Sequence, residues 1–277
     1  MSVVRDALFD GATPIAAWPG DARATAYGDG LFETMRVHRG TVPWRDAHWA
    51  RLAHGAQRLA LRLPERAWVD AAADALFDDG GDGVLKLLVS RGGGGRGYAP
   101  SADAAPLWRV SRHPLPAPPR AGGLVLRWCE TRLSVQPALA GLKHCNRLEQ
   151  VLARAEWDDA GIDEGLLRDT DGHVVGATAA NLFVLHGDRW RTPALDRCGV
   201  AGVCRGFVLR ATGATEARLS AADVGNADAV ALCNAVRGIL GVARLDARAW
   251  AMHPAVAGLQ RDLSRAHPAF PMPQEQA

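Results

Sequence analysis

The sequence has 277 residues, of which 48% are hydrophobic and 22% are charged, and its formal net charge at pH 7 is +2. A chain of this length can bury one large or two medium hydrophobic cores, and so small a net charge does not indicate a nucleic-acid or anionic-membrane partner. The sequence has no long apolar stretch and no N-terminal signal pattern. Its five cysteines form no CxxC pair and no metal-ligand spacing. We therefore predict a cytoplasmic protein with free thiols and without a bound metal.

The first part of the chain alternates strand and helix patterns. Apolar alternation predicts strands at residues 2–9, 29–37, 84–89 and 107–112. Apolar positions at helical spacing predict a helix over residues 46–62, with Asp46 as its N-cap, and a second helix that begins at Pro64 and runs to residue 77. These elements predict an α/β domain over residues 1–113.

A proline-rich segment that ends in a glycine pair, residues 114–123, separates this domain from the rest. Proline keeps such segments extended, which is typical of a linker. Beyond it, the patterns predict strands at 124–129, 164–168, 181–186, 229–233 and 239–245 and helices at 146–161 and 202–210. We predict a second domain over residues 124–277, with a frayed proline-rich tail after Ala266.

Two lysines stand out because the chain uses arginine for almost every other cation. Of the 32 lysines and arginines, only Lys86 and Lys143 are lysine. A guanidinium cannot form a Schiff base, whereas a primary amine can lose its proton and attack a carbonyl. Lys86 lies in an apolar strand pattern and is interpreted as a strand residue whose amine reaches outward. A lone lysine is usually a solvated cation, but the turn before Lys143 and the helical pattern after it favour a nucleophile there.

Three further features suit a phosphate or a carboxylate ligand. Residues 199–205 form a glycine-containing loop that enters a helix, and a helix start presents unpaired N–H groups to an anion. Arg51 could supply a phosphate's countercharge. Arg91, Arg96 and Tyr98 stand in a glycine-rich loop, where a planar guanidinium could clamp a carboxylate. Each feature also has an ordinary interpretation, namely a routine loop before a helix, a solvated helix residue and a flexible surface loop.

No serine-hydrolase, metal-ligand or nucleotide phosphate-loop pattern accompanies these features. A phosphorylated cofactor that carries an aldehyde and is held by a lysine explains all four of them. The sequence therefore predicts pyridoxal 5'-phosphate as the cofactor.

Several blocks of the chain resemble the class IV pyridoxal-phosphate enzymes, which are the fold type IV group. The blocks begin with Tyr27-Gly-Asp-Gly-Leu-Phe-Glu-Thr and continue, in order, at residues 44–52, 181–183 and 199–205, so they cover most of residues 23–245. Three longer blocks, at residues 83–98, 139–152 and 232–235, resemble the aminodeoxychorismate lyases of that group. The resemblance implies a two-domain α/β (α+β) fold like that of D-amino-acid aminotransferase.

The resemblance also implies which residues hold the cofactor. Lys143 matches the Schiff-base lysine, Arg51 matches the phosphate-binding arginine, and Val203 and Cys204 match a pair whose backbone amides hold the phosphate. Two positions match more loosely as further phosphate or substrate contacts, namely Asn234 and Ala235.

The substrate side of the site follows from the same resemblance. Thr34 matches a position beside the cofactor's reactive face. Arg96 and Tyr98 match a loop that reads the substrate carboxylate and that related dimers supply across their interface. A homodimer is therefore expected.

One position departs from the family pattern. The family has a glutamate five residues before the asparagine of Asn181-Leu-Phe, and that glutamate pairs with the cofactor's pyridine nitrogen. Here the position is Gly176, and Glu164 and Asp169 are the nearby acids in the sequence. Arg147 stands where aminotransferases tend to have a tyrosine.

The resemblance implies a lyase that converts 4-amino-4-deoxychorismate into 4-aminobenzoate and pyruvate, which feeds folate synthesis. A branched-chain or D-amino-acid aminotransferase on the same scaffold is the alternative. A diverged binding protein that has lost catalysis is a remoter one, suggested by Gly176, but retention of Lys143 argues against it.

Overall fold

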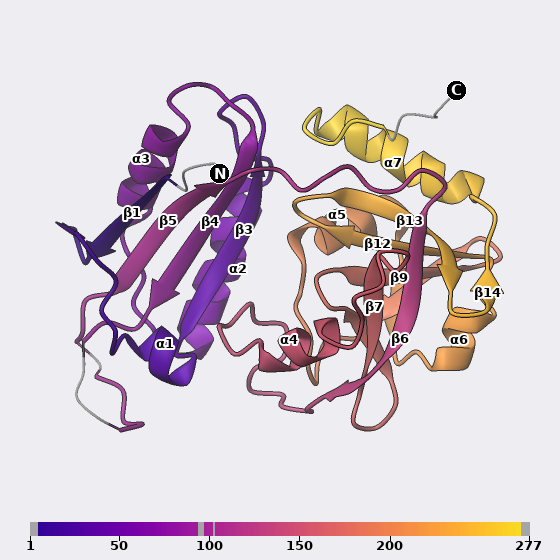
Figure 1. Cartoon of the computed structure of the whole chain (residues 1–277), viewed down its shortest axis with the longest axis horizontal. Helices are drawn as coiled ribbons and strands as arrows, with labels where there is room; N and C mark the ends of the chain where they lie inside the picture. The colour runs from indigo at the N-terminus through magenta and orange to yellow at the C-terminus, as the bar shows by residue number, and fades with distance from the viewer. Residues whose placement is uncertain (1–4, 94–96, 102, 273–277) are drawn as a thin grey trace. The chain divides into compact units, whose positions relative to one another are not determined.

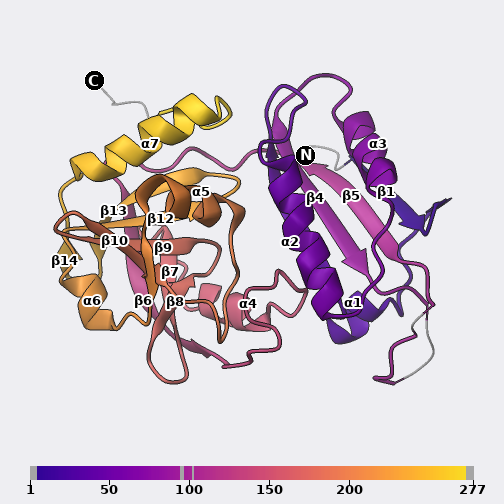
Figure 2. The ribbon, with the colours of Figure 1, turned by 180° about the vertical axis from the view of Figure 1, so that it is seen from behind.

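This computed structural model describes residues 5–93, 97–101 and 103–272, and the chain divides into two compact units. Unit 1 comprises Met1–Pro116 and Leu142–Asn146, and unit 2 comprises Ala117–Gly141 and Arg147–Ala277. Figures 1 and 2 show the ribbon from opposite sides. The first boundary between the units, between Pro116 and Ala117, lies inside the proposed linker. The assignment of residues 1–113 and 124–277 to two domains stays a prediction. The sequence did not indicate that the segment with Lys143 packs with unit 1.

Unit 1 is built on a five-stranded antiparallel sheet in the order β2-β1-β5-β4-β3. Its strands are β1 (Arg5–Asp10), β2 (Thr13–Ile15), β3 (Gly30–Val37), β4 (Gly83–Ser90) and β5 (Leu107–His113), and its helices are α1 (Arg23–Tyr27), α2 (Arg45–Arg58) and α3 (Arg66–Leu76). Helices α2 and α3 cover one face of the sheet, as Figure 2 shows for α2. The strands predicted for this region are confirmed where the structure describes them. Both predicted helices are present, but α2 ends at Arg58 rather than at residue 62, and α3 begins at Arg66, so Pro64 lies before it and not in its first turn.

Strand β3 shows why this sheet has two different faces. Leu31, Met35 and Val37 are buried in the core under α2 and α3. Side chains alternate along a strand, so Phe32 and Thr34 belong to the opposite face, which we call the outer face. Residues on the outer face are only partly buried.

The N-terminus of α2 corrects one prediction. The N-cap is Trp44, in a left-handed conformation with no side-chain capping bond, and Asp46 lies in the first turn instead. Asp46 pairs with Arg66 there, and its charge still suits the positive end of the helix dipole.

Unit 2 holds a nine-stranded mixed sheet in the order β11-β10-β9-β12-β13-β6-β7-β8, with β14 paired to β13. The strands are β6 (Leu124–Leu133), β7 (Glu164–Asp169), β8 (Val174–Ala177), β9 (Asn181–His186), β10 (Arg189–Pro193), β11 (Thr215–Ala217), β12 (Ala229–Asn234), β13 (Gly238–Leu245) and β14 (Arg248–Ala249). The helices are α4 (Leu148–Arg154), α5 (Val203–Thr212), α6 (Ala221–Gly225) and α7 (Pro254–Ala266). The mixed α+β architecture agrees with the predicted fold class.

Three helices of unit 2 differ from the prediction. Helix α4 ends at Arg154 rather than at residue 161, because Trp157 turns into the core and the Asp159 carboxylate accepts a hydrogen bond from Gly161 N at 2.7 Å, which closes a turn. Helices α6 and α7 were not predicted. Helix α7 begins at Pro254, after a His253 side chain that accepts a hydrogen bond from Ala255 N. Among the helices of the described residues, none has the length and apolar character that crossing a membrane requires.

Candidate active site

The backbone of the Leu142–Asn146 segment is tied to the start of β3. Phe32 N donates a hydrogen bond to Lys143 O at 3.0 Å, and Cys145 N donates one to Gly30 O at 2.9 Å. These bonds place the Lys143 side chain over the outer face, where its Nζ lies 4.3 Å from the centre of the Phe32 ring. The amine is therefore held at a defined point beside β3.

A buried ion-pair network lies under β3, on the opposite face. The Glu33 carboxylate accepts hydrogen bonds from Arg51 Nε at 2.8 Å, from Arg51 Nη2, and from His48 Nδ1 at 2.7 Å. His48 and Arg51 are three residues apart on α2 and so share one side of the helix. Glu33 is 1% exposed, so the network fixes the orientation of the Arg51 side chain.

The charges in this network are set by burial and pairing. Burial alone would raise the pKa of the Glu33 carboxyl, but the charge of Arg51 and the hydrogen bonds from His48 and Arg51 bring that pKa below its ordinary value. Burial lowers the pKa of His48, although Glu33 works in the opposite direction. At neutral pH, Glu33 is therefore ionised and His48 is neutral. Glu33 and His48 were not predicted as site residues, although an acid at a buried strand position was a usable signal.

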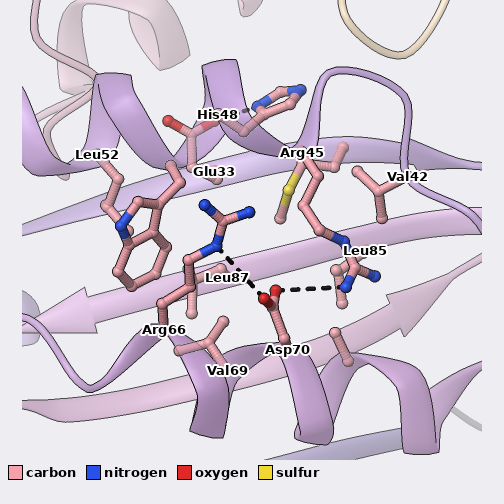
Figure 3. A pocket seen from close by; sticks show the side chains of 13 residues that line it. Glu33, Val42, Arg45, His48, Leu52, Arg66, Val69, Asp70, Leu85 and Leu87 are labelled. Carbon is pink, nitrogen blue, oxygen red and sulfur yellow. Dashed lines mark hydrogen bonds and ion pairs between the residues drawn. The ribbon is translucent and has the colours of Figure 1, made fainter.

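A small pocket opens between β3, α2 and α3, beside this network (Figure 3). It offers about 20 Å³ for the centre of a water molecule, which is space for about one water and not for a ring-shaped substrate. Arg45 and Arg66 pair with Asp70 across it. The pocket is therefore a packing gap rather than the place where chemistry occurs.

The outer face carries Thr34, which lies directly across from Lys86 on β4. Thr34 is partly buried. The structure thus brings Thr34, Phe32 and Lys143 to one side of the sheet. Lys86 is an exposed strand residue, as predicted.

The glycine-rich loop is anchored at both of its ends. Arg91 donates to Asp29 at 2.9 Å and to the carbonyls of Leu59 and Ala60. Arg23 donates to Asp29 at 2.7 Å and to the carbonyls of Gly97 and Tyr98 at 3.0 and 3.2 Å.

Arg91 is thus an anchor of the loop, and the carboxylate clamp considered for it is not supported. Burial would raise the pKa of the Asp29 carboxyl, but hydrogen bonds from Arg91 and Arg23 bring it below its ordinary value. Tyr98 is 86% exposed, at an edge-to-face distance of 5.5 Å from Tyr27. Arg96 lies outside the described residues.

In unit 2, Val203 and Cys204 open helix α5. The N-cap is Gly202, no side chain caps the helix, and its first turn holds no acid. A Cβ on Gly202 would lie 2.1 Å from Asn181 Oδ1, so only glycine fits there. Asn181 Nδ2 donates to Val200 O at 2.9 Å and fixes the loop before the helix. The helix start therefore offers backbone N–H groups that suit an anion.

Strand β12 lies beside this helix start. The neighbouring Cys233 thiol and burial raise the pKa of the Cys204 thiol well above its ordinary value. Cys204 is therefore suited to act through its backbone rather than as a thiolate. Asn234 Oδ1 accepts bonds from Val236 N and Arg237 N, so this side chain shapes the turn that contains Ala235.

Gly176, the position at which the family has a glutamate, lies in β8 opposite Leu167. A Cβ there would come within 2.9 Å of Ala180 O. Glu164 accepts hydrogen bonds from Thr178 Oγ1 and Gly165 N, and Asp169 accepts them from Asp171 N and His173 N. Both nearby acids are thus engaged in local bonds.

Comparisons with known proteins identify the family of this chain. The model of the family "Amino-transferase class IV" matches residues 30–245. The chain is 37% identical to the aminodeoxychorismate lyase of Vibrio harveyi over 234 residues, which is 81% of this chain and 86% of that protein. The crystal structure of 4-amino-4-deoxychorismate lyase from Pseudomonas aeruginosa has a TM-score of 0.86 and 44% identity, and covers 93% of this chain and 98% of that one.

More distant structures share the fold. The branched-chain amino acid aminotransferase of Escherichia coli superposes with a TM-score of 0.80 at 19% identity, covering 92% of each chain. The chain belongs to the class IV aminotransferase family, with the fold type IV architecture.

Proposed function

We propose that the protein is an aminodeoxychorismate lyase, which converts 4-amino-4-deoxychorismate into 4-aminobenzoate and pyruvate for folate synthesis. The observation that carries this proposal is the 44% identity to a solved lyase that covers 98% of that chain. The branched-chain aminotransferase of Methanocaldococcus jannaschii, described as putative, is 30% identical over 66% of this chain. The aminotransferase alternative is therefore weaker.

Pyridoxal 5'-phosphate is the cofactor of this reaction, and the residues present fit it. Lys143 supplies the primary amine that would hold it covalently. The uncapped start of α5 suits its phosphate through the N–H groups of Val203 and Cys204. Arg51, oriented by Glu33, would add positive charge. When bound, the cofactor withdraws electron density from the carbon that carries the substrate nitrogen.

The looser assignments belong to the same proposal. Asn234 and Ala235 would line the phosphate side of the site from the turn after β12. Gly176 would lie where relatives place the acid that faces the pyridine nitrogen. Thr34 would contact the substrate near its reacting carbon from the outer face of β3.

Lys143 would then move the proton that the reaction requires. Its Nζ accepts a proton from the carbon that bears the substrate nitrogen, as a general base. The bond between the ring and the enolpyruvyl oxygen breaks, and the ring becomes aromatic. Lys143 returns the proton to the departing fragment, which leaves as pyruvate. Arg96 and Tyr98 would orient a substrate carboxylate during these steps.

The proposal also includes a homodimer and a cytoplasmic location. Tyr98 is 86% exposed at the end of an anchored loop, which suits a residue that completes the site of a second copy. All five cysteines are free, which is consistent with a reducing compartment.

The decisive test supplies the purified, cofactor-loaded protein with enzymatically generated 4-amino-4-deoxychorismate and measures 4-aminobenzoate and pyruvate in equal amounts. Amino transfer from alanine to a keto acid is measured in parallel. Transfer without 4-aminobenzoate would establish the aminotransferase alternative. A protein that catalyses neither reaction, and that lacks the absorbance of a cofactor bound covalently to lysine, would support a non-catalytic role.

The residue assignment has its own test. Borohydride reduction of the loaded protein followed by peptide mapping is expected to place the cofactor on Lys143. Lys143→Arg keeps the charge but removes the primary amine, so it should lose the label. A label on Lys86 would contradict the assignment.

A further inference from the structure

Both lysines of the chain lie against the same side chain. Nζ of Lys143 is 4.3 Å from the centre of the Phe32 ring, and Nζ of Lys86 is 5.5 Å from it. The two amines can therefore be no farther apart than the sum of these distances. They reach Phe32 from different segments of unit 1, one from strand β4 and one from the Leu142–Asn146 segment.

The Lys86 amine has no acidic partner among the residues that the structure describes. Its cross-strand neighbours on the outer face are Thr34 on β3 and Ser111 on β5, which are both uncharged at neutral pH. Another cation on this face, Arg109 on β5, is paired with Asp6 at 2.6 Å. Lys86 is thus an exposed cation whose charge none of these neighbours neutralises.

The surroundings of Lys86 are electropositive. Burial lowers the pKa of His113, and the charges of Lys86 and Arg109 lower it further. Ser111 shares a hydrogen bond with His113 at 2.9 Å. This part of the outer face therefore attracts an anion and disfavours a further cation.

We propose that Lys86 Nζ binds a carboxylate of the substrate during the reaction. The inference rests on the proposed function, whose substrate carries two carboxylates, one on the ring and one on the enolpyruvyl group. The loop with Arg96 and Tyr98 accounts for one carboxylate, and the second needs its own countercharge. In this substrate, each carboxylate lies only a few bonds from the ring carbon that Lys143 must deprotonate. One amine could therefore contact a carboxylate while the other reaches that carbon, because both amines lie near the Phe32 ring.

The chemistry of this position favours lysine. An ammonium is a compact point charge on a flexible stem, so it can follow a carboxylate while the C–O bond breaks, whereas a guanidinium binds in a fixed planar geometry. Contact with the Phe32 ring limits the freedom of the stem. Lys86 is therefore a specificity residue, whose charge selects a dicarboxylate over an analogue with one carboxylate.

The experiment compares Lys86→Met, Lys86→Arg and a matched control, Arg109→Met, which removes a paired cation from the same face. The probe is chorismate, which keeps both carboxylates and has a hydroxyl in place of the 4-amino group. Its dissociation constant is measured by calorimetry on each cofactor-loaded protein, and KM and kcat are measured with 4-amino-4-deoxychorismate. Cofactor content and Tm are recorded to show that each variant is folded and loaded.

We expect Lys86→Met to weaken chorismate binding by about 10- to 100-fold, which is the range for loss of a charge-assisted hydrogen bond. KM should rise while kcat changes little, because the contact is present in both the ground state and the transition state. Lys86→Arg should restore part of the affinity, and Arg109→Met should bind chorismate like the wild type. Unchanged binding in Lys86→Met, or an equal loss in Arg109→Met, overturns the proposal.

Two smaller probes identify the carboxylate. 4-Hydroxybenzoate carries only the ring carboxylate, and pyruvate carries only that of the departing fragment. A loss in Lys86→Met that is confined to one of them assigns Lys86 to that group and supports the proposal. A wild-type protein that binds chorismate but forms no 4-aminobenzoate refutes the lyase function alone, because the calorimetric comparison of Lys86 variants needs no turnover.

Discussion

Glu33 places a carboxylate at a strand position that is otherwise reserved for the apolar core. Its neighbours on the same side of β3 are Leu31 and Met35. A buried acid is tolerated only when its charge and lone pairs are satisfied, and here Arg51 and His48 satisfy them. The network therefore links the strand that carries Phe32 and Thr34 to the helix that carries the proposed phosphate arginine.

Removing the charge of Glu33 should be costly. Glu33→Gln keeps the shape but removes the negative charge that pairs with the Arg51 guanidinium, whose side chain is 12% exposed. We expect the free energy of unfolding to fall by about 3 kcal/mol, as when one partner of a buried pair is lost. Urea unfolding measures this change. Asp46→Asn, which breaks the exposed pair with Arg66, is the control and should cost less than about 1 kcal/mol. Equal losses would show that the Glu33 pair is no more important than a surface pair.

The same carboxylate predicts a pH dependence. Because the pKa of Glu33 is lower in the folded protein than its ordinary value of 4.5, the folded state binds fewer protons than the unfolded chain as the pH falls below that value. The stabilisation is complete above pH 4.5 and is lost as the pH falls through the folded pKa. The difference in unfolding free energy between wild type and Glu33→Gln should therefore shrink on acidification below 4.5. A difference that stays constant with pH would mean that Glu33 contributes by packing alone.

Gly176 bears on which reaction the enzyme performs. An aminotransferase must maintain negative charge on the substrate carbon long enough to reprotonate the cofactor, and an acid at the pyridine nitrogen supports that charge. In the lyase, loss of the enolpyruvyl group and aromatisation consume the charge quickly. The missing acid should therefore favour elimination over amino transfer.

The test compares Gly176→Glu with Gly176→Ala. Both variants introduce a Cβ that approaches Ala180 O at 2.9 Å, so Gly176→Ala controls for the backbone shift. We expect negligible alanine-to-keto-acid transfer in wild type and in Gly176→Ala, and a relative gain in Gly176→Glu once cofactor occupancy is matched. Wild-type protein that transaminates as readily as it eliminates, or a ratio that the glutamate leaves unchanged, would refute the idea.

The start of helix α5 depends on close packing with β9. Gly202→Ala would drive a Cβ into Asn181 Oδ1 and disturb the bond from Asn181 to Val200 O. If this loop holds the phosphate, the affinity for pyridoxal 5'-phosphate should fall at least about tenfold, which corresponds to roughly one charge-assisted hydrogen bond. Equilibrium titration of the apoprotein measures it.

A control for this substitution lies in the same helix. At Gly206 a Cβ would meet only the end of the Arg210 side chain at 3.5 Å. Gly206→Ala should leave cofactor affinity unchanged and raise the unfolding free energy by roughly 0.5 kcal/mol, because alanine favours the helix. Unchanged affinity in Gly202→Ala would place the phosphate elsewhere.

The elements also show where sequence reasoning succeeds and fails. Strands such as β3 and β4 were predictable because alternation or a continuous apolar run marks them directly. The end of α4 was missed because apolar positions continue past Arg154, and only tertiary packing turns Trp157 into the core. Helix α7 was missed although its His-Pro start is a recognisable capping signal.

For the site, the motif identified the candidate residues but not their partners. Scarcity of lysine singled out Lys143 and Lys86, yet nothing in the sequence indicated that both amines meet at Phe32. Such a contact between segments far apart in the chain depends on the fold, because it requires the Leu142–Asn146 segment to return to β3. Glu33 was overlooked because the resemblance gave it no role.

The exposed aromatic residue on the glycine-rich loop is the feature that suggests a second copy of the chain. Arg23 and Arg91 are 5% and 7% exposed and hold the two ends of the loop. Tyr98, by contrast, leaves most of its ring exposed. Firm anchoring of a loop that presents an exposed aromatic residue at one end is typical of a surface that binds a partner.

A shared site predicts complementation between inactive variants. Lys143→Ala removes the proposed catalytic amine, and the double substitution Arg96→Ala/Tyr98→Ala removes the two side chains that would serve the partner's site. If copies pair symmetrically, co-expression yields half mixed dimers, each with one intact site, so activity should return to about a quarter of the wild-type value. Light scattering should give a dimer mass for wild type and for both variants. A monomer with full activity, or a mixture no more active than its parts, would show that each chain builds its site alone.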